Sequence, residues 1–338
     1  MPSKLRLILT LVSWLTLAAC AERPVLQGSQ LARLEAPGRV VAIGDVHGDL
    51  AATRAALRLA GAIDAEDRWV GGDLVVVQTG DQLDRGDQER EILDLLDRLA
   101  GEAVAAGGAL LVLIGNHEIT NASGLYRWAS ARGLEAFAEV TRDDLPPGVL
   151  EAFPPEERGR AAAFLPGGPY ARLLARRAVV VQVGDTVFVH GGLLPEHVRY
   201  GLGRLNDEVR AWLRGDRPAA PKLILNLTAA PTWSRRVSVP RPSKAACARL
   251  GEALDALGAR RLVVGHTIQE GGINAACGGR VWRIDVGMSE VYGGPVQVLS
   301  IEGDRLEVLK DPATADRRPG QEPGPRAVTP LPAAAPSP

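Results

Sequence analysis

Histidine is scarce in this sequence, and its placement indicates chemistry. The chain has five histidines, and four of them each follow a short apolar run and stand within two residues of a glycine: His47, His117, His190 and His266. The same turns carry further polar groups: Asp45, Asp81 and Asn116. Imidazole and carboxylate groups are ligands of borderline divalent metals, and glycines let the backbone approach a bound ion closely. The pattern predicts a metal centre.

The number of these groups favours two metal ions over one. They exceed the four ligands of a single tetrahedral zinc site, and a carboxylate can bridge two ions. The mixed oxygen and nitrogen set favours Mn, Fe or Zn over Ca or Mg. Two ions about 3.5 to 4 Å apart can hold a hydroxide between them and clamp a phosphoryl oxygen. The residues therefore predict hydrolytic phosphate chemistry at a dinuclear site.

Phosphate monoesters are hydrolysed so slowly without catalysis that cationic donors and a proton donor should accompany the metals. Arg85 directly follows Asp84 in the second turn, where its guanidinium could bind phosphate through two N–H groups. The alternative for Arg85 is an exposed arginine at the start of a helix. We expect it to be a phosphate ligand.

Five short apolar runs precede the polar turns and are predicted strands: Arg39–Ile43, Leu74–Gln78, Leu110–Ile114, Thr186–Val189 and Arg261–Val264. Amphipathic segments follow the first two and are predicted helices: Leu50–Ala60 and Gln88–Ala105. Alternating strands and helices are typical of the α/β class, in which the carboxyl ends of the strands form the binding cleft. The polar turns are therefore expected to meet in one place.

Later in the chain, four further runs are predicted strands: Val179–Val183, Val281–Asp285, Val296–Ile301 and Leu306–Lys310. The dipeptides Gly184-Asp185 and Gly303-Asp304 separate closely spaced runs and predict antiparallel hairpins. Hairpins and strand–helix units in one chain predict two sheets.

Five turns carry a family resemblance. Between Gly44 and Thr267 they read, in chain order, GDVHG, GDQLDRG, GNHE, HGG and GHT. This set resembles the signature of the calcineurin-like metallophosphoesterases, and GDxxDRG with GNHE resembles its phosphoprotein phosphatase branch. The resemblance implies a four-layer α/β/β/α sandwich of two mixed sheets. It also implies hydrolysis of phosphomonoesters by direct attack of a hydroxide bridging two metal ions, without a phosphoenzyme.

The resemblance assigns the metal ligands by motif: Asp45 and His47 to the first ion, Asp81 as the bridge, and Asn116, His190 and His266 to the second ion. His117 would protonate the leaving oxygen, oriented by Asp84. The last turn continues into Ile268 and lacks the second histidine of the GHxH motif found in many other relatives. The phosphoprotein phosphatases lack it too.

The segment Thr232-Trp233-Ser234-Arg235-Arg236 resembles the Trp-x-Arg element of the bacterial Shewanella-like phosphatases. It implies that Arg235 is a second phosphate ligand, with Arg236 as the alternative and two solvated loop arginines as a third reading. The expected substrate is a phosphorylated protein or peptide, on Ser/Thr or Tyr. A nucleotide or small-molecule phosphatase and a non-catalytic phosphate-binding lipoprotein are the competing hypotheses.

The N-terminus has the composition of a leader. Two positive charges precede an apolar run that is too short to span a bilayer comfortably. The end of that run, Leu17–Cys20, resembles a lipobox, so residues 1–19 are predicted to be a lipoprotein signal peptide. Cys20 would carry a membrane anchor on an exported, periplasmic protein of a bacterial envelope. Secretion after cleavage at Ala19-Cys20-Ala21 is the alternative.

The chain has an ordinary globular composition, with 46% hydrophobic and 23% charged residues. The charges nearly cancel, 39 basic against 40 acidic, so no nucleic-acid partner is expected. We predict a linker over 20–37, one metallophosphatase domain over 38–311 and a disordered Pro/Ala-rich tail over 312–338. Cys247 and Cys277 would either pair in an oxidising compartment or remain buried thiols.

A helical insertion is predicted at about 121–177, with helices over Tyr126–Glu139, Glu156–Phe164 and Ala171–Arg176. It could form a lid that selects substrates. Tyr126 and Trp128 could pack on an aromatic phosphate, although the core face of their own helix is the other place for them.

Overall fold

The computed structural model describes residues 33–35, 38–320 and 324. The predicted signal peptide and the anchor on Cys20 lie outside the described residues and stay predictions. Within the predicted linker, Arg33–Leu34 forms strand β1, which pairs with the edge of a sheet. Among the helices of the described ranges, none is both long and apolar enough to cross a membrane.

One sheet has five strands in the order β11-β10-β2-β3-β4. Strands β2 (Arg39–Ile43), β3 (Val75–Gln78) and β4 (Ala109–Val112) run parallel. Strand β10 (Gln297–Glu302) is antiparallel to β2 and forms a hairpin with β11 (Arg305–Lys310). The parallel strands are rich in valine and almost entirely buried, as expected for strands covered on both faces.

The second sheet has six strands in the order β1-β5-β6-β7-β9-β8. Strands β5 (Val180–Val183) and β6 (Thr186–Val189) form an antiparallel hairpin. Strands β6, β7 (Arg261–Val264) and β9 (Val281–Arg283) run parallel, and β8 (Asn274–Ala276) pairs antiparallel with β9. Both predicted hairpins are present, and both sheets are mixed.

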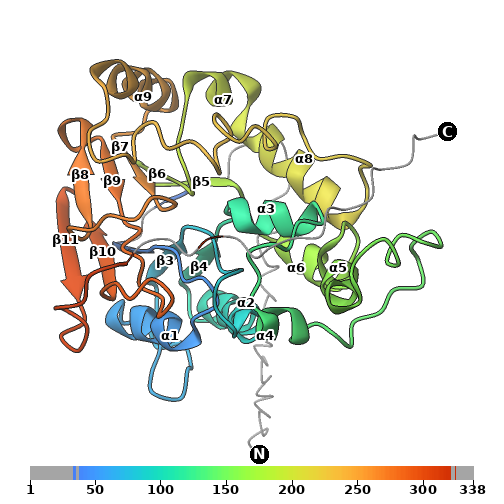
Figure 1. The fold of residues 1–338 in the computed structure, drawn as a ribbon. Coiled ribbons are helices and arrows are strands. Elements are labelled where there is room, and N and C mark those ends of the chain that lie inside the picture. The colour runs from blue at the N-terminus through green and yellow to red at the C-terminus, as the bar shows by residue number, and fades with distance from the viewer. Residues whose placement is uncertain (1–32, 36–37, 321–323, 325–338) are drawn as a thin grey trace, which may run out of the picture.

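Helices cover the outer face of each sheet (Figure 1). Helices α1 (Leu50–Leu59) and α2 (Glu89–Ala105) pack on the five-stranded sheet. Helices α7 (Pro195–Tyr200), α8 (Leu202–Arg214) and α9 (Lys244–Leu257) lie on the other side, over the six-stranded sheet. One apolar core joins the facing sides of the two sheets. The predicted α/β/β/α sandwich is confirmed.

The insertion is only partly helical. Five short helices lie in or next to it: α3 (Asn116–Ala122), α4 (Ala131–Glu135), the 3₁₀ turn η1 (Pro155–Glu157), α5 (Arg158–Phe164) and α6 (Pro169–Leu174). The helix predicted over Tyr126–Glu139 was wrong for most of its length. The backbone carbonyl of Trp128 accepts a hydrogen bond from the Arg85 N–H at 2.9 Å, which holds this stretch against the second polar turn. Ser130 then caps the short helix α4.

The packed chain extends beyond residue 311, where the predicted tail begins. Thr314 is buried, and its hydroxyl accepts a hydrogen bond from the Val296 N–H at 2.9 Å. The Gly320 N–H donates to the carbonyl of Tyr292 at 2.6 Å. These contacts fix a segment whose composition alone predicts disorder.

Cys247 on α9 and Cys277 on the 3₁₀ turn η2 (Cys277–Gly279) form a disulfide, with Cα atoms 5.2 Å apart. The sequence had left the pairing open. The bond ties the outer helix layer to the edge of the six-stranded sheet.

The double substitution Cys247→Ser and Cys277→Ser should lower the free energy of unfolding by about 2 to 4 kcal/mol. The crosslink joins residues 30 positions apart, and its removal restores conformational entropy to the unfolded chain. Urea denaturation of the oxidised wild type and of the variant measures the difference. Reduced wild type is the control and should unfold like the variant; an unchanged midpoint after reduction would contradict the disulfide.

Candidate metal centre

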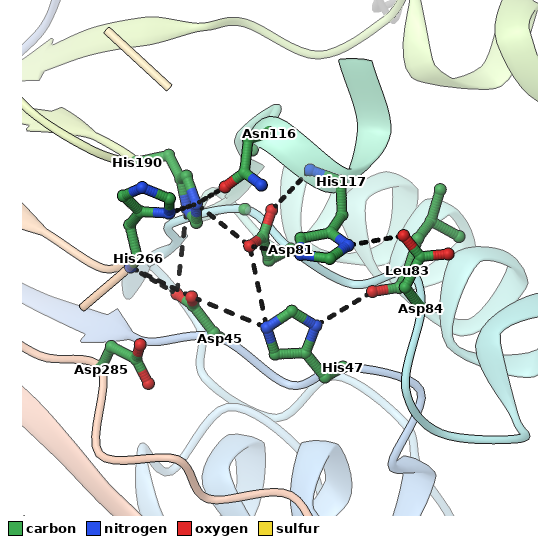
Figure 2. A network of polar contacts seen from close by, with 12 residues as sticks. Asp45, His47, Asp81, Leu83, Asp84, Asn116, His117, His190, His266 and Asp285 are labelled. Carbon is green, nitrogen blue, oxygen red and sulfur yellow. Dashed lines mark hydrogen bonds and ion pairs between the residues drawn. The ribbon is translucent and has the colours of Figure 1, made fainter. Parts of the chain in front are cut away.

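The polar turns meet at one edge of the sandwich. Each predicted metal ligand lies just beyond the carboxyl end of a strand: Asp45 and His47 after β2, Asp81 after β3, Asn116 after β4, His190 after β6 and His266 after β7. All six side chains are buried, and Figure 2 shows them facing a common centre. The structure therefore brings all six predicted ligands together at one site.

Close packing around two carboxylates explains two glycines of the motifs. A Cβ atom at Gly115 would collide with Oδ1 of Asp81, and one at Gly265 would collide with Oδ1 of Asp45. The Asp81 carboxylate also accepts the His117 N–H at 3.0 Å. Glycine is therefore required where the backbone passes these acids.

Four potential ligand atoms converge on one side of the centre. Nε2 of His190 lies 2.8 Å from Oδ1 of Asn116, 3.2 Å from Nδ1 of His266 and 3.1 Å from Oδ2 of Asp81. The other ring nitrogens are engaged by backbone carbonyls: Nδ1 of His190 by Thr79 at 3.0 Å and Nε2 of His266 by Trp233 at 3.2 Å. With the ring protons on those outer nitrogens, lone pairs point inward. This donor set fits a metal cation.

A second group of acceptors lies on the other side of Asp81. Nε2 of His47 is 3.7 Å from Oδ2 of Asp81 and 4.0 Å from Oδ2 of Asp45. Nδ1 of His47 faces the carbonyl of Leu83 at 3.0 Å, which again directs a lone pair inward. Asp81 thus belongs to two groups of potential ligands, as a bridging carboxylate must.

The electrostatics also fit bound cations. Burial and the neighbouring carboxylates of Asp285 and Asp81 raise the pKa of Asp45, and burial raises the pKa of Asp285 to about 6. Burial and the adjacent His117 lower the pKa of His47 to about 4, and burial and His190 lower that of His266. Repelling carboxylates beside neutral imidazoles are costly to bury alone, and a cation removes that cost.

His117 differs from the other histidines in its partner. Its Nδ1 lies 2.5 Å from Oδ2 of Asp84, and its Nε2 lies 3.9 Å from Oδ2 of Asp81. Burial opposes protonation, but the carboxylates of Asp81 and Asp84 raise the pKa of His117 to about 9. Distance alone also groups His117 with His47 and Asp81 as a possible ligand. Its carboxylate partner and high pKa instead favour a proton donor.

Comparison with known proteins matches residues 38–270 to the family model described as calcineurin-like phosphoesterase. The chain belongs to this family. It is 43% identical to Shewanella-like protein phosphatase 2 of Arabidopsis thaliana, over 80% of this chain and 77% of that protein. It is 29% identical to Shewanella-like protein phosphatase 1 of Plasmodium berghei (strain Anka), over 81% and 74%. A solved structure, the cold-active protein-tyrosine phosphatase of a psychrophilic Shewanella species, matches with a TM-score of 0.64 and 25% identity, over 83% and 84%.

The candidate phosphate-binding arginines of this calcineurin-like phosphoesterase, Arg85, Arg235 and Arg236, differ in their position relative to the site. Arg235 lines a cavity of about 240 Å³ over the metal-ligand groups, whereas Arg236 does not. Arg235 donates to the carbonyl of His266 at 2.5 Å and to Oγ1 of Thr267 at 3.0 Å. Arg85 is outside the cavity lining, but its positive charge opposes protonation of both His47 and His117. The geometry favours Arg235 over Arg236.

Two acids near the centre were not predicted to take part. Asp285 lines the cavity and follows β9, on the same side of the centre as Asp45 (Figure 2). Its position two residues after a parallel strand is the signal that located the other ligands. Sequence reasoning treated Asp285 only as the end of a strand.

Glu118 is the second acid, and it shapes the turn that carries Asp81. One carboxylate oxygen accepts the N–H groups of Gly115 at 2.7 Å and Asp81 at 2.9 Å; the other accepts those of Gln82 at 2.9 Å and Leu83 at 3.2 Å. The buried carboxylate thus satisfies four backbone donors. The GNHE motif contains Glu118, but the sequence alone does not show which backbone groups this side chain binds.

Three aromatic rings line the cavity, each beside one histidine of the centre. The ring of Trp128 is 5.3 Å from that of His117, Tyr292 is 5.4 Å from His47, and Trp233 is 5.7 Å from His266. Of the two aromatic residues singled out in the insertion, Tyr126 is buried against Phe153 and only Trp128 faces the cavity.

Asp81→Asn should reduce the bound metal of Mn-loaded protein from two equivalents to one or fewer, because both ligand groups contain this carboxylate. Elemental analysis of dialysed protein measures the ratio. His117→Asn is the matched control and should keep its metal while losing turnover by about 10²- to 10⁴-fold. Wild-type protein that never binds more than one equivalent would exclude a dinuclear centre.

Arg235→Ala should raise KM for phosphorylated substrates by about 10- to 150-fold, since one charge-assisted contact contributes about 1.5 to 3 kcal/mol. Arg236→Ala, the neighbouring control, should leave KM within twofold of wild type. Steady-state kinetics of the two variants decides between them. The reverse order of effects would transfer the role to Arg236.

Proposed function

We propose that this chain is a metal-dependent protein phosphatase that prefers phosphotyrosine. The hydrolase chemistry rests on two groups of inward-facing acceptors that share Asp81. Protein substrates are supported by the relatives, two of which are called Shewanella-like protein phosphatases. The mixed oxygen and nitrogen ligands suit Mn, Fe or Zn.

The proposed roles follow from the side chains that converge on the centre (Figure 2). Asp45, Asp81 and His47 would hold one ion; the other would be held by Asp81 with Asn116, His190 and His266. When bound, the two ions would polarise the phosphoryl group and activate water. Arg235 at the cavity wall would bind a phosphoryl oxygen.

His117 is placed to complete the reaction by proton transfer. Asp84 holds Nδ1, so Nε2 faces the cavity that contains the metal-ligand groups. As the bond between phosphorus and the ester oxygen breaks, the Nε2 proton passes to that oxygen and an alcohol or phenol leaves. Loss of this step should matter most for ester oxygens that are strong bases.

The preference for tyrosine rests on the aromatic walls of the cavity. Trp128, Tyr292 and Trp233 border the site where the ester group must lie, and a phenyl ring packs against such walls better than a serine methylene. One aromatic contact contributes about 0.5 to 1.5 kcal/mol. A solved structural neighbour that is named a protein-tyrosine phosphatase supports the same preference.

Peptides of one sequence carrying phosphotyrosine, phosphoserine or phosphothreonine test the proposal, with nucleotides assayed in parallel. The phosphotyrosine peptide should have a kcat/KM higher by about tenfold, and Trp128→Ala should lower that value by about two- to tenfold. Trp69→Ala, outside the cavity lining, is the control. A preference for nucleotides would overturn the protein substrate, and equal rates on all three peptides would overturn the tyrosine preference.

A further inference from the structure

A buried ionic cluster lies behind the proton donor. It contains two acids and one base, Asp84, Glu89 and Arg160, and the side chains of all three are fully shielded from solvent. Asp84 belongs to the second polar turn, Glu89 begins helix α2, and Arg160 comes from helix α5 of the insertion. The two oxygens of Asp84 divide their contacts: Oδ2 meets His117, and Oδ1 meets Arg160 at 3.0 Å.

The guanidinium of Arg160 is held on every side. Its Nε donates to Oδ1 of Asn121 at 2.7 Å, and its Nη1 donates to the Gly133 carbonyl at 2.9 Å and to Glu89. The rings of Phe137 and Phe164 lie 5.5 and 5.2 Å from its central carbon. The planar guanidinium group has fixed partners in three directions, so this side chain has little freedom to move.

Two partners of Arg160, Glu89 and Asn121, also form hydrogen bonds with Asp84. Glu89 accepts the Asp84 backbone N–H at 2.5 Å. The Asn121 amide, whose oxygen binds Arg160, donates its Nδ2 to both oxygens of Asp84 at 3.2 Å. Asp84 has a left-handed backbone, with φ of 67°, and such a conformation persists only when its surroundings impose it.

Helix α5 reaches this depth because of small residues. A Cβ atom at Gly159 would collide with the backbone carbonyl of Phe137, so glycine lets the helix approach that segment. The three alanines after Arg160, residues 161–163, are fully buried. The insertion thus places the guanidinium group of Arg160 behind the site.

We propose that Arg160 is a positioning residue for proton transfer. It fixes the Asp84 carboxylate so that Oδ2 holds Nδ1 of His117 and directs Nε2 toward the ester oxygen. This inference rests on the proposed function, because it assumes that His117 delivers the proton. It gives the insertion a role in catalysis that differs from a lid.

A role in proton transfer predicts dependence on the leaving group. p-Nitrophenolate leaves readily without a proton, whereas phenolate depends more on protonation of the ester oxygen as the bond to phosphorus breaks. A misdirected His117 should therefore slow phenyl phosphate far more than p-nitrophenyl phosphate. A general loss of folding or metal would slow both equally.

Two variants test the inference. Arg160→Lys keeps the positive charge but loses the fork, and the double variant Arg160→Met with Glu89→Met removes a buried charge pair together, which limits the cost in stability. For each, kcat on phenyl phosphate should fall by about 10- to 100-fold, against at most about threefold on p-nitrophenyl phosphate. KM and bound metal should stay unchanged. Arg158→Met, an exposed arginine on the same helix, is the control and should behave as wild type.

A second measurement uses metal-free protein and no substrate. The Nδ1 proton of His117, hydrogen-bonded to Asp84, should give a low-field proton NMR resonance in wild type and in Arg158→Met. That resonance should shift or disappear in Arg160→Lys. Equal losses on the two esters, an unchanged resonance, or loss of metal would each overturn the inference. Wild-type protein inactive on both esters would instead count against the proposed function.

Discussion

One buried carboxylate organises this site. Oδ2 of Asp81 lies 3.1 Å from His190, 3.7 Å from His47 and 3.9 Å from His117, so a single atom is within reach of three imidazoles from three different turns. Burial opposes its charge, but these histidines hold the pKa of Asp81 well below its usual range. The surroundings therefore favour the charged form of this carboxylate, which suits a ligand shared by two cations.

Three residues of the site have strained backbone conformations. Asp81, His47, and His266 have left-handed φ angles of 55°, 39° and 66°, which residues with a side chain adopt at a cost of about 1 to 3 kcal/mol each. The Glu118 carboxylate offsets part of that cost by accepting four backbone N–H groups of the adjoining turns. Such strain concentrates at functional sites because a relaxed turn would point the side chain elsewhere.

The histidines of this site have different roles because the ring nitrogen that faces away from the centre has a different partner in each case. Backbone carbonyls face Nδ1 of His47 and His190, so a proton on that nitrogen leaves the Nε2 lone pair facing the centre. A carboxylate faces Nδ1 of His117 and favours the protonated ring. Behind that carboxylate, Arg160 and Glu89 complete a chain of fixed contacts that reaches from the insertion to the cavity.

The sequence by itself determined the features that depend on local pattern. Short apolar runs, glycine-rich turns and the dipeptide at Gly184-Asp185 specify strands, polar strand ends and hairpins through residues a few positions apart. For this reason two sheets were expected from the pattern, and the residues from Asp45 to His266 were expected to meet at one edge. The motif resemblance added the roles that spacing alone left open.

Only the tertiary structure decided the contacts between distant segments. A turn stands at Trp128 where a helix was predicted, and its carbonyl accepts the backbone N–H of Arg85, which is far away in sequence. The burial of Arg160, the cavity position of Asp285 and the pairing of Cys247 with Cys277 likewise depend on which segments pack together. No local pattern encodes these contacts, because the residues that form each one are far apart in the sequence. They become neighbours only when the two sheets and the insertion have packed together.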